Sequence, residues 1–490
     1  MTKDIKELEG AIEQIVHDWH VPGADVSVVK DQQMISCRGY GVRELGKPEP
    51  PDGDTIFGIG SNTKSFTAAG VGLLVDEGKL GWDDLIIKYL PDFALSDPEV
   101  TKQITLRDVL CHRSGMGRSM RILYHKGFTN AEILHNLRYF EPVRPFRYDF
   151  GYNNFHFMIA GAVIEAVSGQ SWPEFTAERI FKPLSMGRSF ADLQSTLGHD
   201  NMSGAHANLD DSLLPHHARL FAPENVVDYD DVGNQPAGGI NSTAADLTHW
   251  MRMLLADGKW EDQQILSPQA IAAMFTPSSV MLDPMNNLLG PIAAMNAGVH
   301  FYTYGLGWLI FDYKGYKVVM HGGQITGFNS AVVLVPEAGL GFSVLLNSHQ
   351  TISHIPLVLM MLDFFLGGGQ RDWNKEYLGA IQHIHQGELA EHQKLLESRK
   401  PNTNPTLPKE AYIGSYHNAF MGGTEVMLEG DTLMMAYGKG YLGDLVHWHD
   451  DTFYVRWSNR TFDHNFITFT VKDGAVTAVE VQDEALFERV

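Results

Sequence analysis

Residues 57–64 read Phe57-Gly58-Ile59-Gly60-Ser61-Asn62-Thr63-Lys64 and lead into an apolar run with helical spacing. This turn of small residues at the start of a helix predicts that Ser61 and Lys64 lie one turn apart on the same face. The positive potential of a helix N-terminus disfavours a charged ammonium there, so a neutral Lys64 would be able to take the proton of Ser61. In the alternative interpretation, Ser61 only caps the helix and Lys64 is a solvated residue of its first turn.

The same Ser-x-x-Lys spacing occurs a second time, at Ser27 and Lys30. These two residues belong to a β-type run, in which successive side chains alternate between faces, so they would point apart and could not exchange a proton. We therefore expect the nucleophile at Ser61. Three other enzyme patterns are absent from the sequence: the Gly-x-Ser-x-Gly elbow, His-Glu-x-x-His, and a phosphate loop that ends in Gly-Lys-Ser or Gly-Lys-Thr.

A second segment, residues 150–155, reads Phe-Gly-Tyr-Asn-Asn-Phe and precedes an apolar helix. We expect the hydroxyl of Tyr152 and the amide of Asn154 to lie on a turn that faces a cleft, where a phenol can carry out general acid–base chemistry. The Tyr-x-Asn pattern recurs at Tyr416 and Asn418, so its position in the chain gives it weight. The alternative is a half-buried Tyr152 that only caps the helix.

A third segment is the β-type run of residues 318–330, which contains His321-Gly322-Gly323-Gln324. Its glycines allow the backbone to approach a ligand closely, as a strand edge must when it pairs with a substrate and donates an N–H group. An oxyanion hole needs such donors. We therefore expect His321, Gly322, Gly323 and Gln324 to line the substrate site.

The order Ser-x-x-Lys, Tyr-x-Asn, His-x-Gly resembles that of the serine β-lactamase-like superfamily, which includes class C β-lactamases, DD-peptidases, D-aminopeptidases and related esterases. Residues 104–116 and 236–243 are also similar to family segments, and the resemblance covers roughly residues 5–366. It implies an acyl-enzyme on the nucleophile, proton transfers shared by the lysine and the tyrosine, and an asparagine that orients lysine and substrate. The residues in these roles would be Ser61, Lys64, Tyr152 and Asn154, with the backbone N–H groups of Ser61 and Gln324 as the oxyanion hole.

One departure concerns substrate choice. β-Lactamases of this superfamily usually carry Lys-Thr-Gly or Lys-Ser-Gly where this chain has His321-Gly322-Gly323. A histidine with an ordinary pKa of about 6.5 is only partly cationic at neutral pH, and glycine removes a hydroxyl donor. We therefore expect a hydrolase of amide or ester bonds in small substrates, D-aminoacyl peptides or amides or short acyl esters. The alternatives are a weak β-lactamase, an acyltransferase that uses the same acyl-enzyme, and a non-catalytic sensor of acyl ligands.

The element pattern predicts an α+β, β-lactamase/transpeptidase-like fold. Strands are expected at 24–29, 35–40, 305–313, 317–321, 329–335 and 341–347, so that both ends of the catalytic domain build one antiparallel sheet with helices inserted between them. After a Pro-bounded run at 401–408, short β-type runs predict a small all-β domain. We expect a hydrolase domain at 1–369, a helical linker at 370–408 and a small β-barrel, lipocalin-like domain at 409–490.

Composition limits the partners. The 490 residues hold 37 Lys and Arg against 59 Asp and Glu, a formal net charge of −22, which would repel nucleic acid and anionic membranes. The two cysteines, Cys37 and Cys111, and the carboxylates within residues 1–9 favour a reducing, cytoplasmic location without a signal peptide. No metal-ligand spacing is evident among the 22 histidines, so we expect no metal and no cofactor. The expected partners are a small substrate and, as a possibility, further copies of the chain.

Overall fold

The computed structural model describes residues 5–117, 128–207, 219–220, 235–285, 288–295, 297–349, 352–367, 371–438, 441–457, 466–482 and 484–490. The chain divides into two compact units: Met1–Ser119, Glu141–Asn208 and Ser212–Ile381 form the first, and Met120–Phe140, Leu209–Asp211 and Gln382–Val490 form the second. The expected boundary between residues 369 and 370 lies outside the described residues. The division at 1–369, 370–408 and 409–490 stays a prediction.

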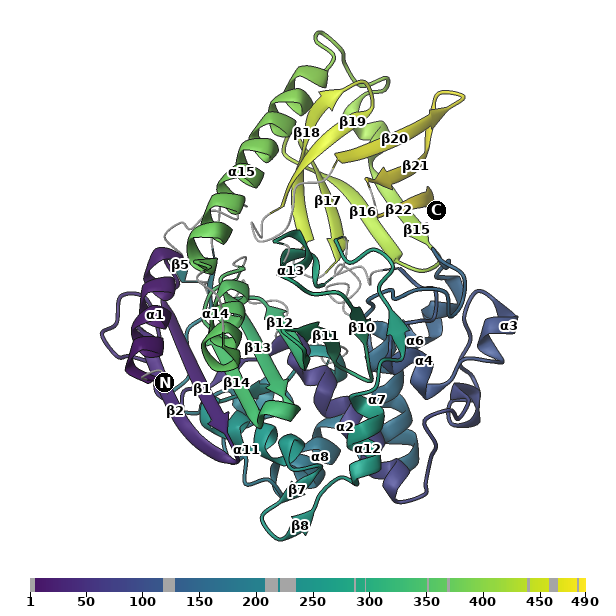
Figure 1. The fold of residues 1–490 in the computed structure, drawn as a ribbon. Coiled ribbons are helices and arrows are strands. Elements are labelled where there is room, and N and C mark those ends of the chain that lie inside the picture. The colour runs from purple at the N-terminus through teal and green to yellow at the C-terminus, as the bar shows by residue number, and fades with distance from the viewer. Residues whose placement is uncertain are drawn as a thin grey trace. The chain divides into compact units, whose positions relative to one another are not determined.

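Helices surround the sheet of the first unit (Figure 1). They are α1 (Ile5–Asp18), α2 (Thr63–Asp76), α3 (Pro98–Thr101), α4 (Leu106–Leu110), α7 (Phe155–Ser168), α8 (Trp172–Thr176), α9 (Leu193–Thr196), α10 (Gln235–Gly238), α11 (Ala244–Leu255), α12 (Pro268–Met274), α13 (Gly290–Ala294) and α14 (His354–Leu366). Single turns are η1 (Gly60–Asn62), η2 (Ile86–Lys88), η4 (Ala177–Phe181) and η8 (Pro336–Ala338). Helix α15 (Trp373–Ser398) runs from the first unit into the second.

The helices follow from their apolar patterns. Helix α1 buries one stripe, Leu8, Ile12, Ile15 and Val16, and leaves its other side to solvent. Helix α2 is different, because every residue from Thr63 to Leu74 is buried. A helix buried all round must lie at the centre of its domain, and α2 begins two residues after Ser61.

The first unit is built on one antiparallel sheet, confirming the expected α+β fold. Its strand order is β2-β1-β14-β13-β12-β11-β10-β9. The strands are β1 (Gly23–Lys30), β2 (Gln33–Gly41), β9 (Ser279–Val280), β10 (Tyr302–Tyr304), β11 (Leu309–Tyr313), β12 (Tyr316–Ile325), β13 (Phe328–Val335) and β14 (Leu340–Leu346). Two-residue ladders pair β3 (Phe57–Gly58) with β6 (Asn241–Ser242), β4 (His206–Ala207) with β5 (Arg219–Leu220), and β7 (Lys259–Trp260) with β8 (Gln263–Gln264).

The two faces of this sheet have different neighbours. Helices α1 and α14 lie on one face, where α14 packs on β13 and β14 (Figure 1). Helix α11 packs on β1 and β14 from the other face, on which a Cβ at Gly341 would touch Leu255 and Met251. Gly323 of β12 faces this second side too, because it shares a face with Val319, whose partner Leu334 pairs with Gly341. A Cβ at Gly323 would meet the carbonyl of Ile59 just before η1. The segment that carries Ser61 therefore lies on the α11 side of the sheet.

Two expected strands have different limits in the structure. The run expected at 305–313 is split, because β10 ends at Tyr304 and β11 begins at Leu309. Gly307 lies between them with φ 77°, and a Cβ there would approach the carbonyl oxygen of Lys64 to 2.7 Å. Only glycine fits this turn comfortably. The strand expected at 317–321 continues to Ile325, so the whole His321–Gln324 segment lies on β12.

The second unit contains a closed barrel in the order β15 to β22, which confirms the expected small β domain. Its strands are β15 (Gly414–Asn418), β16 (Gly422–Glu429), β17 (Thr432–Gly438), β18 (Tyr441–His449), β19 (Thr452–Trp457), β20 (Phe466–Lys472), β21 (Ala475–Val481) and β22 (Ala485–Arg489). Short helical elements are α6 (Asn130–Asn136), η3 (Leu137–Tyr139) and η9 (Lys409–Tyr412). Buried rings such as Tyr412, Tyr416 and Phe469 pack at centroid distances of 4.9 and 6.1 Å.

None of the helices among the described residues combines the length and the apolar character needed to cross a bilayer.

An unpartnered carboxyl group lies inside the first unit. Asp25 of β1 is fully buried on the α11 face, and neither of its oxygens has a hydrogen-bond partner among the described residues. Burial, together with nearby Asp52, raises the pKa of Asp25 to about 8. The folded protein therefore keeps Asp25 protonated at a pH where the unfolded chain ionises it.

This difference predicts a pH-dependent stability. Between about pH 4 and pH 8 the free energy of unfolding should fall with rising pH, by up to about 1.4 kcal/mol per pH unit from Asp25 alone. Asp25→Asn should remove that slope and raise the melting temperature most at about pH 8. Thermal melts of both proteins across this range test it, with Asp257→Asn, an exposed change away from Asp25, as the control. Parallel curves for the wild type and Asp25→Asn would contradict the assignment.

Candidate active site

Ser61 lies in η1, between β3 and α2, and is half-buried. Gly60 before it has φ 50°, a left-handed conformation that glycine adopts at little cost. A Cβ at Gly60 would come within 2.8 Å of the backbone nitrogen of Gln324. The turn thus places Ser61 directly against β12, and two of the segments singled out in the sequence meet here.

Three hydrogen bonds fix this turn to its surroundings. The Oγ of Ser330 on β13 donates to the carbonyl of Ile59 at 2.8 Å and accepts from Asn62 Nδ2 at 2.8 Å. The N–H of Ile59 donates to the carbonyl of Ile240 at 3.0 Å. Asn62 and Ser330 are both buried. The position of the Ser61 hydroxyl is therefore set by buried polar groups on two neighbouring segments.

Two side chains converge on the Ser61 hydroxyl. Lys64 Nζ lies 3.0 Å from Ser61 Oγ, and the hydroxyl of Tyr152 donates to the same oxygen at 2.7 Å. The lysine nitrogen also lies 4.9 Å from the centre of the Tyr152 ring. One oxygen is thus in contact with two groups that can take or give a proton.

Lys64 is fully buried. Its Nζ donates to the carbonyl of Ala237 at 2.7 Å, and among the described residues it forms no ion pair. Desolvation lowers the pKa of Lys64 well below its usual value of 10.5, because the charged ammonium loses its hydration without gaining a carboxylate. A neutral amine beside Ser61 can accept the hydroxyl proton.

Sequence reasoning assigned no role to Ala237, whose carbonyl holds Lys64 in place. It belongs to the family-like segment at 236–243, and that similarity was the available signal. Two more contacts tie this segment to α2: Thr67 Oγ1 donates to the carbonyl of Pro236 at 2.6 Å, and Ile240 N donates to Thr63 Oγ1 at 3.1 Å. A backbone carbonyl has no sequence signature, so the fold alone could reveal it.

The segment around Tyr152 ends at the start of α7. Tyr152 is half-buried, whereas Asn153 next to it is buried, with its Nδ2 bound to the carbonyl of Gly117 at 2.6 Å and its Oδ1 accepting from Phe155 N at 2.8 Å. Asn154 is the N-cap residue of α7, yet its side chain makes no capping hydrogen bond. Asn153, which the sequence did not single out, therefore holds the turn, and a role for Asn154 toward Lys64 stays a prediction.

His321 is buried beside this group. Its Nδ1–H donates to the carbonyl of Gly322 at 2.5 Å, and its Nε2 accepts from the hydroxyl of Tyr304 at 2.9 Å. Its ring centre lies 6.4 Å from that of Tyr152. Desolvation lowers the pKa of His321 to about 3. The expectation of a partly cationic histidine near neutral pH is thus wrong, because that expectation used the value of a solvated side chain.

The glycines after His321 lie in two different environments. A Cβ at Gly323 would come within 1.9 Å of the carbonyl oxygen of Ile59, so only glycine allows the turn of Ser61 to approach β12. At Gly322 the nearest heavy atoms to a Cβ would be 3.8 and 3.9 Å away, which leaves room for a side chain. Gly323 is therefore required by close backbone contact, and Gly322 is not.

The backbone of Gln324 points to an unpaired strand edge. Two-residue turns join Tyr313 to Tyr316 and Ile325 to Phe328, and the pairs that flank such turns share hydrogen bonds. Counting along β12 from either turn, even-numbered residues direct their N–H and C=O groups to the β11 side. The pairing with β11 ends at Met320, and no described strand continues it. The N–H of Gln324 is thus directed to an edge where an extended substrate can bind.

The described residues offer no metal centre. No group of three or more His, Cys, Asp or Glu side chains among them is arranged to hold an ion.

Comparison with known proteins identifies the family. Residues 8–355 match the family model described as Beta-lactamase. The chain belongs to the beta-lactamase family. Residues 398–489, which include the barrel, match a second model, a domain of unknown function named DUF3471. The family and its hydrolase-named relatives make this chain a serine hydrolase.

Relatives of the beta-lactamase family cover much of this chain. It is 29% identical over 428 residues to the unguisins hydrolase ungD′ of Aspergillus campestris, which covers 84% of this chain and 75% of the relative. The octameric penicillin-binding protein homologue of Pyrococcus abyssi superposes with TM-score 0.62 at 23% identity, covering 99% of this chain and 100% of that one. The D-stereospecific amidohydrolase of a Streptomyces species superposes with TM-score 0.59 at 23% identity, covering 75% of this chain and 100% of that one.

The burial of the histidines predicts their titration. Observed by NMR through its ring nitrogens, His321 should stay in the neutral Nδ1–H form and show no midpoint between about pH 5 and pH 8. His156, whose burial lowers its pKa to about 3, should behave alike. A midpoint near 6.5 for His321 would show that water reaches the ring.

Proposed function

We propose that this chain forms an acyl-enzyme on Ser61 and hydrolyses amide or ester bonds of small substrates, either D-aminoacyl peptides and amides or short acyl esters. The observation that carries the proposal is the convergence of Lys64 Nζ and the Tyr152 hydroxyl on Ser61 Oγ, at 3.0 and 2.7 Å. A helix-capping serine needs neither contact. The pair matches what a two-step acyl transfer requires, a base for the attack and an acid for the leaving group.

The acylation step uses these groups in order. Neutral Lys64 takes the proton as Ser61 Oγ bonds to the carbonyl carbon of the substrate, and the carbonyl π electrons move to its oxygen. When the tetrahedral intermediate collapses, the bond to the leaving group breaks and Tyr152 gives that group a proton. Tyr152 regains its proton from Lys64, whose nitrogen lies near the phenol ring. Water then repeats the sequence in reverse and releases the acid.

The negative oxygen of the intermediate needs N–H donors. Those of Ser61 and Gln324 are suitable, since Gly60 brings the two backbones together and the Gln324 N–H is directed to the unpaired edge of β12. Preorganised donors of this kind supply a large part of the rate enhancement in acyl transfer. Gly323 would keep the turn of Ser61 close to β12, where the substrate is to lie along the strand edge.

Two arguments support the substrate class. His321 is neutral and its ring nitrogens are engaged, so it offers no cation to a substrate carboxylate of the β-lactam type. In addition, one relative is named a hydrolase of unguisins, and one structural neighbour is a D-stereospecific amidohydrolase. We therefore favour amide and ester substrates without a required carboxylate.

We extend the proposal to assembly and location. The homologue from Pyrococcus abyssi is described as octameric, which supports testing this chain for homo-oligomers by light scattering. A cytoplasmic location also stays a proposal, supported by the scarcity of cysteine.

Removal of the nucleophile gives the direct test. Ser61→Ala should lose covalent labelling by a fluorescent acylating probe and lower ester turnover by at least about a thousand-fold, with the circular dichroism spectrum unchanged. Ser27→Ala is the matched control, because Ser27 has the same spacing to a lysine but is bound to Ser343 inside the sheet. It should keep both labelling and turnover. Near-native turnover by Ser61→Ala would refute the acyl-enzyme on Ser61.

A substrate panel tests the predicted selectivity. Nitrocefin should be turned over with a kcat/KM at least tenfold below that of the best p-nitrophenyl ester or D-aminoacyl p-nitroanilide. The double variant His321→Lys/Gly322→Thr should shift the ratio toward nitrocefin by about one to two orders of magnitude, since a charge-assisted hydrogen bond is worth roughly 1.5 to 3 kcal/mol. Gly322→Ala, which adds no hydroxyl, is the control. Equal kcat/KM for nitrocefin and the best ester in the wild type would contradict this selectivity and indicate a β-lactamase.

A further inference from the structure

His112 has a backbone conformation that is rare for its residue type. It follows α4 with φ 58°, in the left-handed region, and its side chain is fully buried. Residues other than glycine are held there only where the surrounding contacts require it. The imidazole packs among the rings of Phe150, Phe157 and Tyr304, and a further group of its contacts holds Tyr152.

His112 forms hydrogen bonds to the two residues that flank Tyr152 in the sequence. The carbonyl of His112 accepts from the N–H of Gly151 at 2.7 Å, and its Nδ1 accepts from the N–H of Asn153 at 3.2 Å. Between these two bonds, the imidazole packs on the Tyr152 ring with centroids 4.7 Å apart. Gly151, Asn153 and the ring of Tyr152 are thus all held by His112, through its imidazole and its backbone carbonyl.

A chain of hydrogen bonds fixes the orientation of the imidazole. Because Nδ1 of His112 accepts from Asn153, the Nδ1–H of His156 must donate to it, at 2.8 Å. The hydroxyl of Ser114 then donates to Nε2 of His156 at 2.6 Å. Desolvation lowers the pKa of His112 and of His156, so both imidazoles in this chain of hydrogen bonds are neutral. The donor and the acceptor in each bond are therefore fixed.

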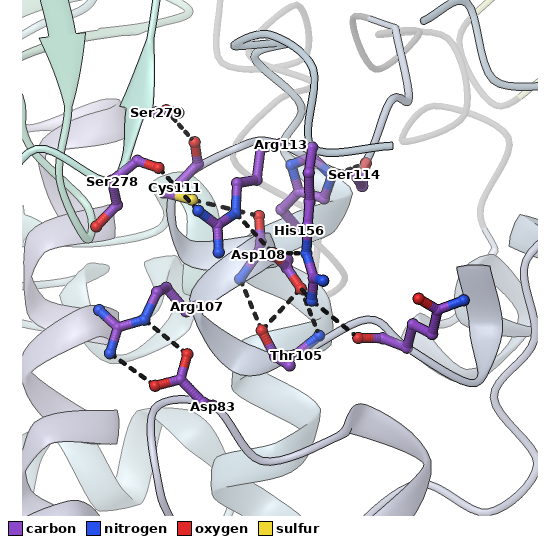
Figure 2. Close-up of polar contacts among 12 residues, drawn as sticks. Asp83, Thr105, Arg107, Asp108, Cys111, Arg113, Ser114, His156, Ser278 and Ser279 are labelled. Carbon is purple, nitrogen blue, oxygen red and sulfur yellow. Dashed lines mark hydrogen bonds and ion pairs between the residues drawn. The ribbon is translucent and has the colours of Figure 1, made fainter. Parts of the chain in front are cut away.

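An ion cluster around the buried carboxylate of Asp108 holds the backbone on either side of His112. Figure 2 shows Asp108 between Thr105 and Arg113, with Ser114 and His156 close by. Asp108 Oδ1 accepts from Arg113 Nε at 2.6 Å, and Oδ2 accepts from Arg147 Nη2 at 2.7 Å. The N–H of Arg147 in turn donates to the carbonyl of Arg113 at 2.9 Å. The turn that carries His112 and the segment that leads to Tyr152 are therefore fixed to each other.

We propose that His112 is a positioning residue that holds the Tyr152 hydroxyl on Ser61, and that its left-handed conformation is retained for this purpose. The inference rests on the proposed function, in which Tyr152 protonates the leaving group. A hydroxyl displaced by a fraction of an ångström still permits attack by Ser61, because Lys64 is held independently by Ala237. The displaced hydroxyl fails at the later step, protonation of the leaving group, because that step depends on its alignment with the departing atom.

Leaving-group chemistry separates positioning from simple loss of folded protein. An alkoxide must be protonated as it departs, whereas p-nitrophenolate leaves as a stable anion. We therefore compare kcat/KM for an ethyl ester and a p-nitrophenyl ester of the same acyl group, since this constant covers the steps up to loss of the leaving group. Active sites are counted with an acylating probe, so misfolded protein does not enter the rates.

Two substitutions at His112 give opposite expectations. His112→Phe keeps a ring but removes the acceptor, and should lower kcat/KM for the ethyl ester at least tenfold more than for the p-nitrophenyl ester. His112→Asn keeps an acceptor near the Nδ1 position and tolerates the left-handed conformation, and should restore most of the difference. The control is His249→Asn on α11, which alters a histidine bond to the carbonyl of Leu184 and should change both esters equally.

The outcomes decide between the possibilities. If His112→Phe lowers both esters by the same factor while the probe still labels Ser61, the positioning role is overturned and the proposed function stands. If the probe does not label Ser61 in the wild type, the proposed function fails and the inference fails with it. Should His112→Phe give no folded protein, His156→Leu replaces it: a greater loss for the ethyl ester supports the role, and equal losses refute it.

Discussion

The site depends on the desolvation of a single amine. Lys64 lies at full burial with a hydroxyl and a carbonyl oxygen as neighbours, and among the described residues no carboxylate balances it. A carboxylate would restore the ammonium and remove the base. His112, His156 and His321, which lie nearby, are neutral for the same reason, since burial lowers the pKa of each. Fixed neutral hydrogen bonds therefore surround Ser61.

Charged side chains lie outside the set of neutral groups that surrounds Ser61. Asp108 is buried, but Arg113 and Arg147 balance it, and these hydrogen bonds hold its pKa below the usual range despite burial. Asp25, on the same side of the sheet as Ser61, has no such partner, and its pKa moves the other way. The contrast shows how the fold separates two uses of a buried carboxyl: a paired one fixes two segments, and an unpaired one lowers stability as the pH rises.

The sequence predicted the parts of the site that depend on local spacing. Ser61 and Lys64 are one turn apart on any helix, and the strand character of Ser27 and Lys30 excluded the other match. Residues whose role depends on tertiary contact were missed: Ala237 acts through its carbonyl, and Asn153 and His112 through backbone bonds of a distant segment. The charge of His321 was mispredicted because burial does not appear in a local pattern. The same limit explains the split at Gly307, which is set by the approach to α2.

The order of the strands has a consequence for biosynthesis. Strand β1 pairs with β2, its neighbour in sequence, but its other edge pairs with β14, so that Val26 lies opposite Val344. On the ribosome, the edge of β1 has no partner until most of the catalytic unit has been translated. Contacts that distant in sequence form slowly, and an apolar strand that waits for them is open to association with other nascent chains. The chain is thus a candidate client for chaperones that bind extended apolar segments, and slower translation before β14 would lengthen its exposure.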